Sequence, residues 1–169
     1  QIYDQLYPPQ AGKQDYQSLG RICRGLLQEA VKSNNSFDRI YAAGALVEQG
    51  DFSRLALLEE SRLGDDAMVR ISAYQELIEV SRQRGRHEAI APLLKQAFID
   101  QDEIVRIQML ETLKRMENQD PSLLPPLEKL LEDQNPLVRA EVAEILGEMV
   151  PSSALAPLEK ALQDEDGNV

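Results

Sequence analysis

The chain has 169 residues, of which 43% are hydrophobic and 5% aromatic, and it contains no tryptophan. That length suffices for one compact domain or one short repeat array with an aliphatic core. The 29 acidic residues outnumber the 18 lysines and arginines, so the net charge is −11. Because an acidic surface repels phosphate backbones, we expect no nucleic-acid partner.

The apolar residues are spread along the chain rather than gathered in one run. No run reaches the roughly 18 residues that a membrane-spanning helix needs, and we find no signal peptide. The single cysteine, Cys23, cannot form an internal disulfide. We therefore expect a cytoplasmic protein without a membrane partner.

The chain opens with residues 1–15, which contain Pro8, Pro9 and Gly12 and are expected to form an extended or disordered lead-in. Helical patterns follow in pairs from residue 16 to the end, and no strand pattern is present. We expect the first helices of the pairs near 16–32, 52–63, 87–99, 121–132 and 153–163. The second helices are expected near 36–49, 66–82, 102–117 and 135–149.

The second helices repeat one phrase. DQNPLVRAEVAEILGEM at 133–149 is a near-copy of DQDEIVRIQMLETLKRM at 100–116. Val-Arg pairs end at Arg70, Arg106 and Arg139, which are 36 and 33 residues apart, and Asp38-Arg39 is a degenerate first copy. Periods in this range are typical of solenoids.

Each Arg is preceded at a distance of four residues by a good helix-capping residue, namely Asn35, Asp66, Asp102 or Asn135. The first helices repeat as well, since PLEKLLED at 126–133 recurs as PLEKALQD at 157–164. One helix pair cannot bury its own apolar face, so such pairs stack. The pattern predicts a single all-α solenoid over residues 16–169, with about four and a half repeats and an end within the last repeat.

The stretches APLLKQAFIDQDEIVR, PPLEKLLEDQNPLVRAEVAEILG and APLEKALQDEDGNV resemble HEAT-like repeats, and most closely the short repeats of the phycobilin lyase family. In HEAT-type arrays the Arg of the Val-Arg pair commonly bonds to carboxylates of the turns. The resemblance therefore implies a structural network that joins Arg70, Arg106 and Arg139 to Asp66, Asp102 and Asp133. It carries over no catalytic residue.

In HEAT-type solenoids the second helices line the concave face, and the residues two, five, six and nine positions after each Arg point outward. On this face we expect the partner-binding residues Tyr41, Glu48, Gln75, Glu76, Glu79, Gln108, Glu111, Arg115, Glu141, Glu144 and Glu148; the same count includes Gly44, Ala45, Ser72, Thr112 and Ile145. Seven glutamates against one arginine favour a groove that binds a basic segment of another protein. The alternative is a solvated face that only keeps the chain soluble.

No residue pattern predicts catalysis. Cys23 lies in an apolar context and is expected to be buried, and His87 is the only histidine, so we expect no metal site. We favour a non-catalytic scaffold or adaptor without a cofactor. The resemblance leaves open a phycobilin lyase subunit, a chromophore chaperone or a phycobilisome turnover factor. A bilin would be bound only in this alternative, and the chain offers it Tyr41, Tyr74 and Phe98 but few inward-facing basic residues.

The end of the chain carries a separate expectation. Leu155, Leu158 and Leu162 would form the apolar face of the last helix, whose second helix is missing. Because the ends of solenoids need polar caps, this face is predicted to self-associate, to meet a further repeat or to contact the partner.

Overall fold

The computed structural model describes residues 12–116, 120–149, 159, 162, 164, 166, 167 and 169. Within these residues all regular structure is helical. The first helices of the pairs are α2 (Gly12–Ala30), α4 (Leu55–Ser61), α6 (Ile90–Ala97) and α8 (Leu124–Leu130), and the second helices are α3 (Ser36–Glu48), α5 (Ala67–Gln83), α7 (Glu103–Lys114) and α9 (Pro136–Met149). Short 3-10 turns at Phe52–Arg54, His87–Ala89 and Pro121–Leu123 lead into α4, α6 and α8.

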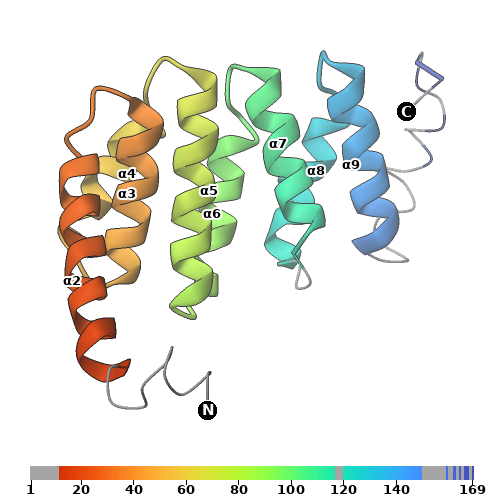
Figure 1. Ribbon diagram of the computed structural model, residues 1–169. Helices are drawn as coiled ribbons and strands as arrows, with labels where there is room; N and C mark the ends of the chain where they lie inside the picture. Colours follow the sequence, from red (N-terminus) through yellow and green to blue (C-terminus); the bar gives the residue numbers. More distant parts are fainter. Residues whose placement is uncertain are drawn as a thin grey trace, which may run out of the picture.

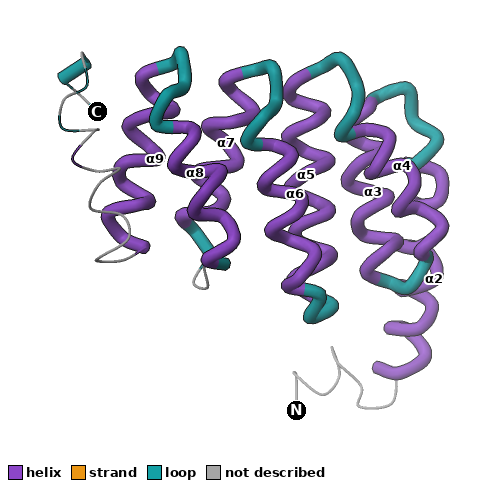
Figure 2. Tube along the Cα trace, turned by 180° about the vertical axis from the view of Figure 1, so that it is seen from behind, coloured by secondary structure: helices purple, strands orange, loops and turns teal. Residues whose placement is uncertain are grey.

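The helix pairs stand side by side in chain order and form two layers. The second helices α3, α5, α7 and α9 form the layer nearer the viewer in Figure 1, and the shorter helices α4, α6 and α8 lie nearer in the reverse view of Figure 2. Each second helix packs on the next, as α3 on α5, α5 on α7 and α7 on α9. The fold is an all-α solenoid of stacked helix pairs, as the repeats in the sequence predict.

Helix positions follow the sequence closely, with one difference at the start of α2. α2 begins at Gly12 rather than near residue 16, so residues 12–15 are helical and not part of an extended lead-in. The prolines of the lead-in end at Pro9, and nothing after them prevents a helix from starting. Residues 1–11 and most of the expected helix 153–163 lie outside the described residues.

The four expected capping residues begin the second helices. Asn35 accepts a hydrogen bond at Oδ1 from the backbone N–H of Phe37 (2.9 Å), and Asp66 accepts from Met68 (2.8 Å). Asp102 caps α7 through the N–H of Ile104 (2.9 Å) in the same way. Asn135 accepts from Leu137 (2.8 Å), directly before Pro136 opens α9. Each cap satisfies a backbone donor that the first helical turn leaves without an intrahelical partner.

The core between the two layers is aliphatic. Ile40, Leu46, Leu58, Leu94, Leu110 and Ile145 are among its fully buried side chains. Phe98 and Tyr74 are its aromatic members, 1% and 3% exposed. Because each pair shares this core with its neighbours, burial continues along the array and not within one pair.

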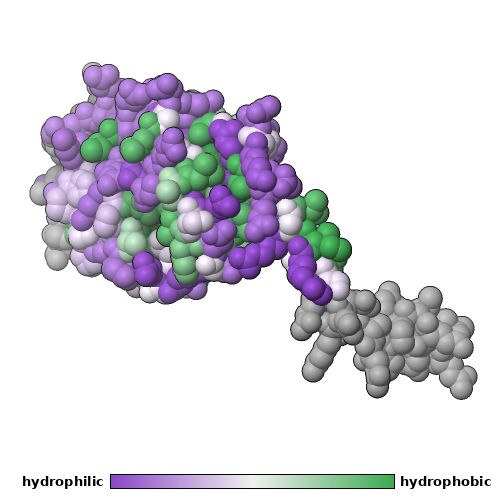
Figure 3. All heavy atoms as spheres, turned by 90° about the vertical axis from the view of Figure 1, so that its left-hand side faces the viewer, coloured by the Kyte–Doolittle hydropathy of each residue, from purple (hydrophilic) through white to green (hydrophobic). Residues whose placement is uncertain are grey.

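The burial predicted for Cys23 on the first helix, α2, is wrong. Cys23 is exposed and not buried. α2 is the first described helix and packs on α3 through Leu27 and the following Val31, and another of its faces has no neighbour among the described residues. Leu19, Ile22 and Leu26 on that face are 56%, 60% and 66% exposed. Figure 3, which looks at this end, shows hydrophobic side chains gathered among polar ones.

Candidate functional site: the second-helix face

A ladder of buried ion pairs joins the turns between the helices of each pair. Arg70 donates to Asp100 from Nε (2.9 Å) and from Nη2 (2.7 Å). Arg106 forms the same two bonds with Asp133 (both 2.8 Å), and Arg139 forms them with Asp164 (both 2.7 Å). Two parallel bonds from a guanidinium to a carboxylate fix both distance and orientation. The ladder therefore sets the spacing of successive turns.

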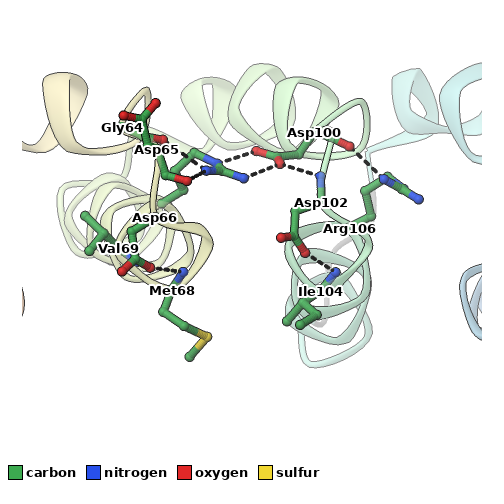
Figure 4. A network of polar contacts seen from close by, with 10 residues as sticks. Gly64, Asp65, Asp66, Met68, Val69, Asp100, Asp102, Ile104 and Arg106 are labelled. Carbon is green, nitrogen blue, oxygen red and sulfur yellow. Dashed lines mark hydrogen bonds and ion pairs between the residues drawn. The ribbon is translucent and has the colours of Figure 1, made fainter.

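Each aspartate of the ladder also organises its own turn. Figure 4 shows the Asp100 carboxylate, which accepts a further hydrogen bond at Oδ1 from the backbone N–H of Asp102 (3.0 Å). Asp133 and Asp164 accept in the same way from Asn135 and Asp166 (both 2.9 Å). Burial raises the pKa of Asp100, but the bonds from Arg70 and from the Asp102 N–H outweigh it and hold this pKa below its usual value. Asp100 is thus an ionised member of a nearly buried pair.

The expected network has the right arginines, but two of its acidic partners are wrong. Asp66 and Asp102 cap their own helices with their carboxylates and accept no hydrogen bond from Arg70 or Arg106. Asp133 is a partner as expected: its carboxylate pairs with Arg106, and its backbone oxygen accepts a bond from Arg139 (2.8 Å). The pairs reach across to the next repeat because stacking brings that turn beside each arginine.

The ladder stops before the first repeat. Arg39 donates to the Ser33 backbone oxygen (2.8 Å), as Arg106 does to that of Asp100 (2.7 Å). The ladder aspartate of the next turn would stand at residue 64, two positions before the cap Asp66, and that residue is a glycine. A second guanidinium nitrogen, Arg39 Nη2, donates to Ser36 Oγ (2.9 Å) and not to a carboxylate. One inter-repeat ion pair is therefore missing between the first and second repeats.

The surface formed by α3, α5, α7 and α9 is called the second-helix face below, and it holds the residues expected to bind a partner. Tyr41, Glu48, Arg115, Glu144 and Glu148 are exposed on these helices, and Gln75, Glu76, Glu79, Gln108, Glu111 and Glu141 are partly exposed. Three positions counted as outward are buried, namely Gly44, Ser72 and Ile145. Gly44, for example, lies against Glu76 of α5, a contact between helices that a count along a single helix does not capture.

Basic side chains compensate several glutamates of this face. Lys114 reaches from α7 to α9 and bonds to Glu141 (3.0 Å) and to Glu144. Arg115 pairs with Glu111 (3.3 Å) on the same helix. In α5, Arg82 pairs with Glu79 (2.7 Å). The sequence count of one arginine against seven glutamates missed Lys114 and Arg82, because each lies just outside the counted positions.

Glu48 and Glu76 remain without a basic partner among the described residues. The Glu76 carboxyl lies against α3, in the space that any Cβ at Gly44 would occupy. Burial there, together with the charges of Glu48 and Glu79, raises the pKa of Glu76 to about 7. The α3–α5 part of the face thus holds two neighbouring carboxyl groups, Glu48 and Glu76, that have no basic partner among the described residues.

The described residues contain no group of three or more His, Cys, Asp or Glu side chains that could hold a metal ion. His87 is exposed in the turn before α6. Tyr74 and Phe98, which a bilin-binding role would use, lie in the core. In the same part of the chain no helix is long and apolar enough to cross a membrane.

The architecture defines a class of protein, the α-solenoids built from helix pairs. A family model for HEAT repeats matches residues 90–169, which begin at α6. No curated protein matches the chain. The match supports a HEAT-like repeat protein and does not single out the phycobilin lyase variety. HEAT repeats commonly act as scaffolds for protein interactions.

Proposed function

We propose that the chain is a non-catalytic interaction scaffold that binds a basic segment of a partner protein on its second-helix face. The observation that carries this proposal is the Glu48–Glu76 pair, which has no basic partner among the described residues although Glu76 is half-buried. A carboxyl group in such a position costs free energy when ionised, and a cation beside it recovers that cost. The structural ladder lies in the turns, so binding on this face would leave it intact.

The proposal places the strongest attraction at α3 and α5. Glu141 and Glu144 share Lys114, and Glu111 has Arg115, so a basic side chain from a partner gains less there. Tyr41, 53% exposed on α3, adds an aromatic surface on which a lysine or arginine can stack. Electrostatic attraction of this kind sets the association rate and the specificity more than the affinity.

A peptide experiment tests the proposal. An amphipathic peptide with Lys and Arg on one face, and a matched peptide with Gln at those positions, are titrated against the chain by fluorescence anisotropy. Glu48→Gln/Glu76→Gln should weaken binding of the basic peptide roughly tenfold, the order expected when a charge-assisted contact is lost. Glu141→Gln/Glu144→Gln should have the smaller effect.

The matched control is Glu60→Gln/Glu88→Gln, which changes the net charge equally at exposed positions outside the second-helix face. It should bind the basic peptide like the parent chain, and the affinity of both should fall as salt is raised. Equal losses of affinity in Glu48→Gln/Glu76→Gln and in Glu60→Gln/Glu88→Gln would mean that the attraction is nonspecific. Binding of the Gln peptide as tight as that of the basic peptide would mean that its positive charges are not recognised. Either result would reject the docking face.

A further inference from the structure

A cavity of about 410 Å³ opens between the layers at the second and third repeats, on the side of the first helices. Its lining comes from α4 and α6, which stand next to each other in Figure 2, and from the C-terminal half of α5. Ser81, Ala89 and Pro92 are small residues of this lining. The cavity volume lies within the roughly 300–1,000 Å³ range of small-molecule sites.

The inner wall of this cavity is apolar. Val47, Leu77 and Val80 are buried core residues that form its deep side, and Leu55 and Leu93 flank them. Such a wall favours an aliphatic or aromatic body that removes it from water.

The cavity also carries positive charge. Arg62, Arg84 and Arg86 line it against a single acid, Glu59, which pairs with Arg62 (2.5 Å). Three positive charges minus one negative leave a local balance of +2 in a chain whose net charge is −11. This local reversal of sign points to an anionic ligand.

Two of the arginines have donors available. Arg84 lies over the ring of Phe52 (4.0 Å from the centroid) and donates one bond from Nη2 to the Val47 backbone oxygen (2.6 Å). A guanidinium has five N–H donors, so most of those of Arg84 remain. The Arg86 side chain has no partner among the described residues, and it follows Gly85, whose positive φ of 65° turns the chain after α5. The stacked Arg84 is held in place, and Arg86 can close on a bound anion.

We propose that this cavity binds an amphipathic acid, such as a medium-chain fatty acid. Its apolar body lies against Val47, Leu77 and Val80, and its carboxylate accepts hydrogen bonds from Arg84 and Arg86. Both an apolar wall and convergent cations are needed for such a ligand, and the cavity supplies both. The site lies outside the second-helix face, so it is independent of the scaffold proposal.

The test uses dansyl-undecanoate, whose fluorescence rises in apolar surroundings. The probe should bind and should be displaced by decanoate but not by methyl decanoate, which has the same chain without the charge. Arg84→Gln/Arg86→Gln should weaken probe binding roughly tenfold, because each bond to a charged group contributes substantially. Arg21→Gln/Arg24→Gln on α2 is the matched control, since it removes the same charge from exposed positions and should change nothing.

A second variant tests the cavity itself. Ser81→Phe fills the space from α5 and should abolish probe binding, and unchanged circular dichroism would show that the fold persists. Arg86→Gln alone removes no contact within the described structure, so weaker probe binding by this variant cannot come from a folding defect. Displacement by the ester as well as by the acid would overturn the proposal, as would unchanged binding in both Ser81→Phe and the arginine variants. If the probe is displaced by a peptide with a C-terminal leucine carboxylate and not by decanoate, the ligand is a peptide end and not a free fatty acid, which would overturn the proposal.

Discussion

Arg106 of α7 and Asp133 in the turn before α9 are joined by two parallel hydrogen bonds of 2.8 Å, although 27 residues separate them. Their side chains are 13% and 8% exposed. Two equivalent pairs continue the same line, so the spacing of the repeats depends on charge-assisted bonds as well as on apolar packing.

Loss of one ladder partner should be costly. Asp133→Asn leaves the Arg106 guanidinium nearly buried without a counter-charge, and removal of one partner of a buried pair costs about 3–5 kcal/mol. We expect the free energy of unfolding to fall by about 3 kcal/mol in urea titrations followed by circular dichroism. The exposed Asp65→Asn in the turn before α5 is the control and should stay within about 0.5 kcal/mol of the parent. A loss no larger than that of the control would mean that the ladder does not stabilise the array.

The missing pair can be restored. Gly64→Asp would place a carboxylate where Arg39 lacks an acidic partner, and the added Cβ meets only the Ser61 backbone oxygen at 3.3 Å. We expect an increase of about 1 kcal/mol in the free energy of unfolding, part of which Gly64→Ala should reproduce by reducing the freedom of the unfolded chain. The remainder should vanish in the Arg39→Ala background, which a double-mutant cycle measures. A gain that is independent of Arg39 would contradict the assigned repeat register.

Glu76 should make the stability depend on pH. Its pKa rises from 4.5 to about 7 in the folded chain, so the folded state holds the proton more tightly than the unfolded state. The stability from this group is present in full below pH 4.5 and is lost as the pH rises through 7. Glu76→Gln should therefore exceed the parent by about 1 kcal/mol above pH 7, less than the full shift implies because solvent screens the half-exposed group.

The difference should disappear toward pH 4.5, and Glu60→Gln on α4 should show no such trend. Thermal unfolding at several pH values measures both. A constant offset between Glu76→Gln and the parent at every pH would exclude titration of Glu76 as the cause.

Because Gly44 has no side chain, it leaves the space in which the Glu76 carboxyl group lies half-buried. Gly44→Ala places a methyl group in the space of the Glu76 carboxyl, which must swing toward solvent. Since Ala also exceeds Gly in helix propensity, the variant should be more stable by up to about 1 kcal/mol at neutral pH. Carboxyl NMR titration should then give Glu76 a pKa nearer its ordinary value. An unchanged, raised pKa would mean that Gly44 does not determine the environment of Glu76.

The sequence predicted the elements of the fold well because each repeat carries its own signals. Asn35, Asp66, Asp102 and Asn135 cap the second helices as expected, since capping depends on residues two or three positions away. The Arg–Asp pairs were harder, because their separations of 30, 27 and 25 residues vary from repeat to repeat. The nearer Asp66 and Asp102 share the fixed four-residue spacing, which is visible in sequence but belongs to the caps.

The candidate site depended on neighbours that one helix cannot reveal. Cys23 was expected inside because its flanks are apolar, yet it is exposed on α2, where no described residue covers it. Glu76 and Gly44 meet only when α3 and α5 pack together. The stretch RQRGR at 82–86 supplies two of the arginines that line the cavity, but the sequence alone did not indicate a cavity because its wall is built from several stacked helices.

The most direct test of the scaffold proposal is the proton balance when a basic peptide binds. A cation that docks beside Glu76 should lower its pKa from about 7, so the complex should release protons near neutral pH. Calorimetric titrations in buffers with different ionisation enthalpies measure this release. We predict binding enthalpies that differ between buffers for the parent chain and agree between them for Glu76→Gln. Buffer-independent enthalpies for the parent, with equally tight binding to Glu76→Gln, would contradict a docking site at the α3–α5 part of the second-helix face.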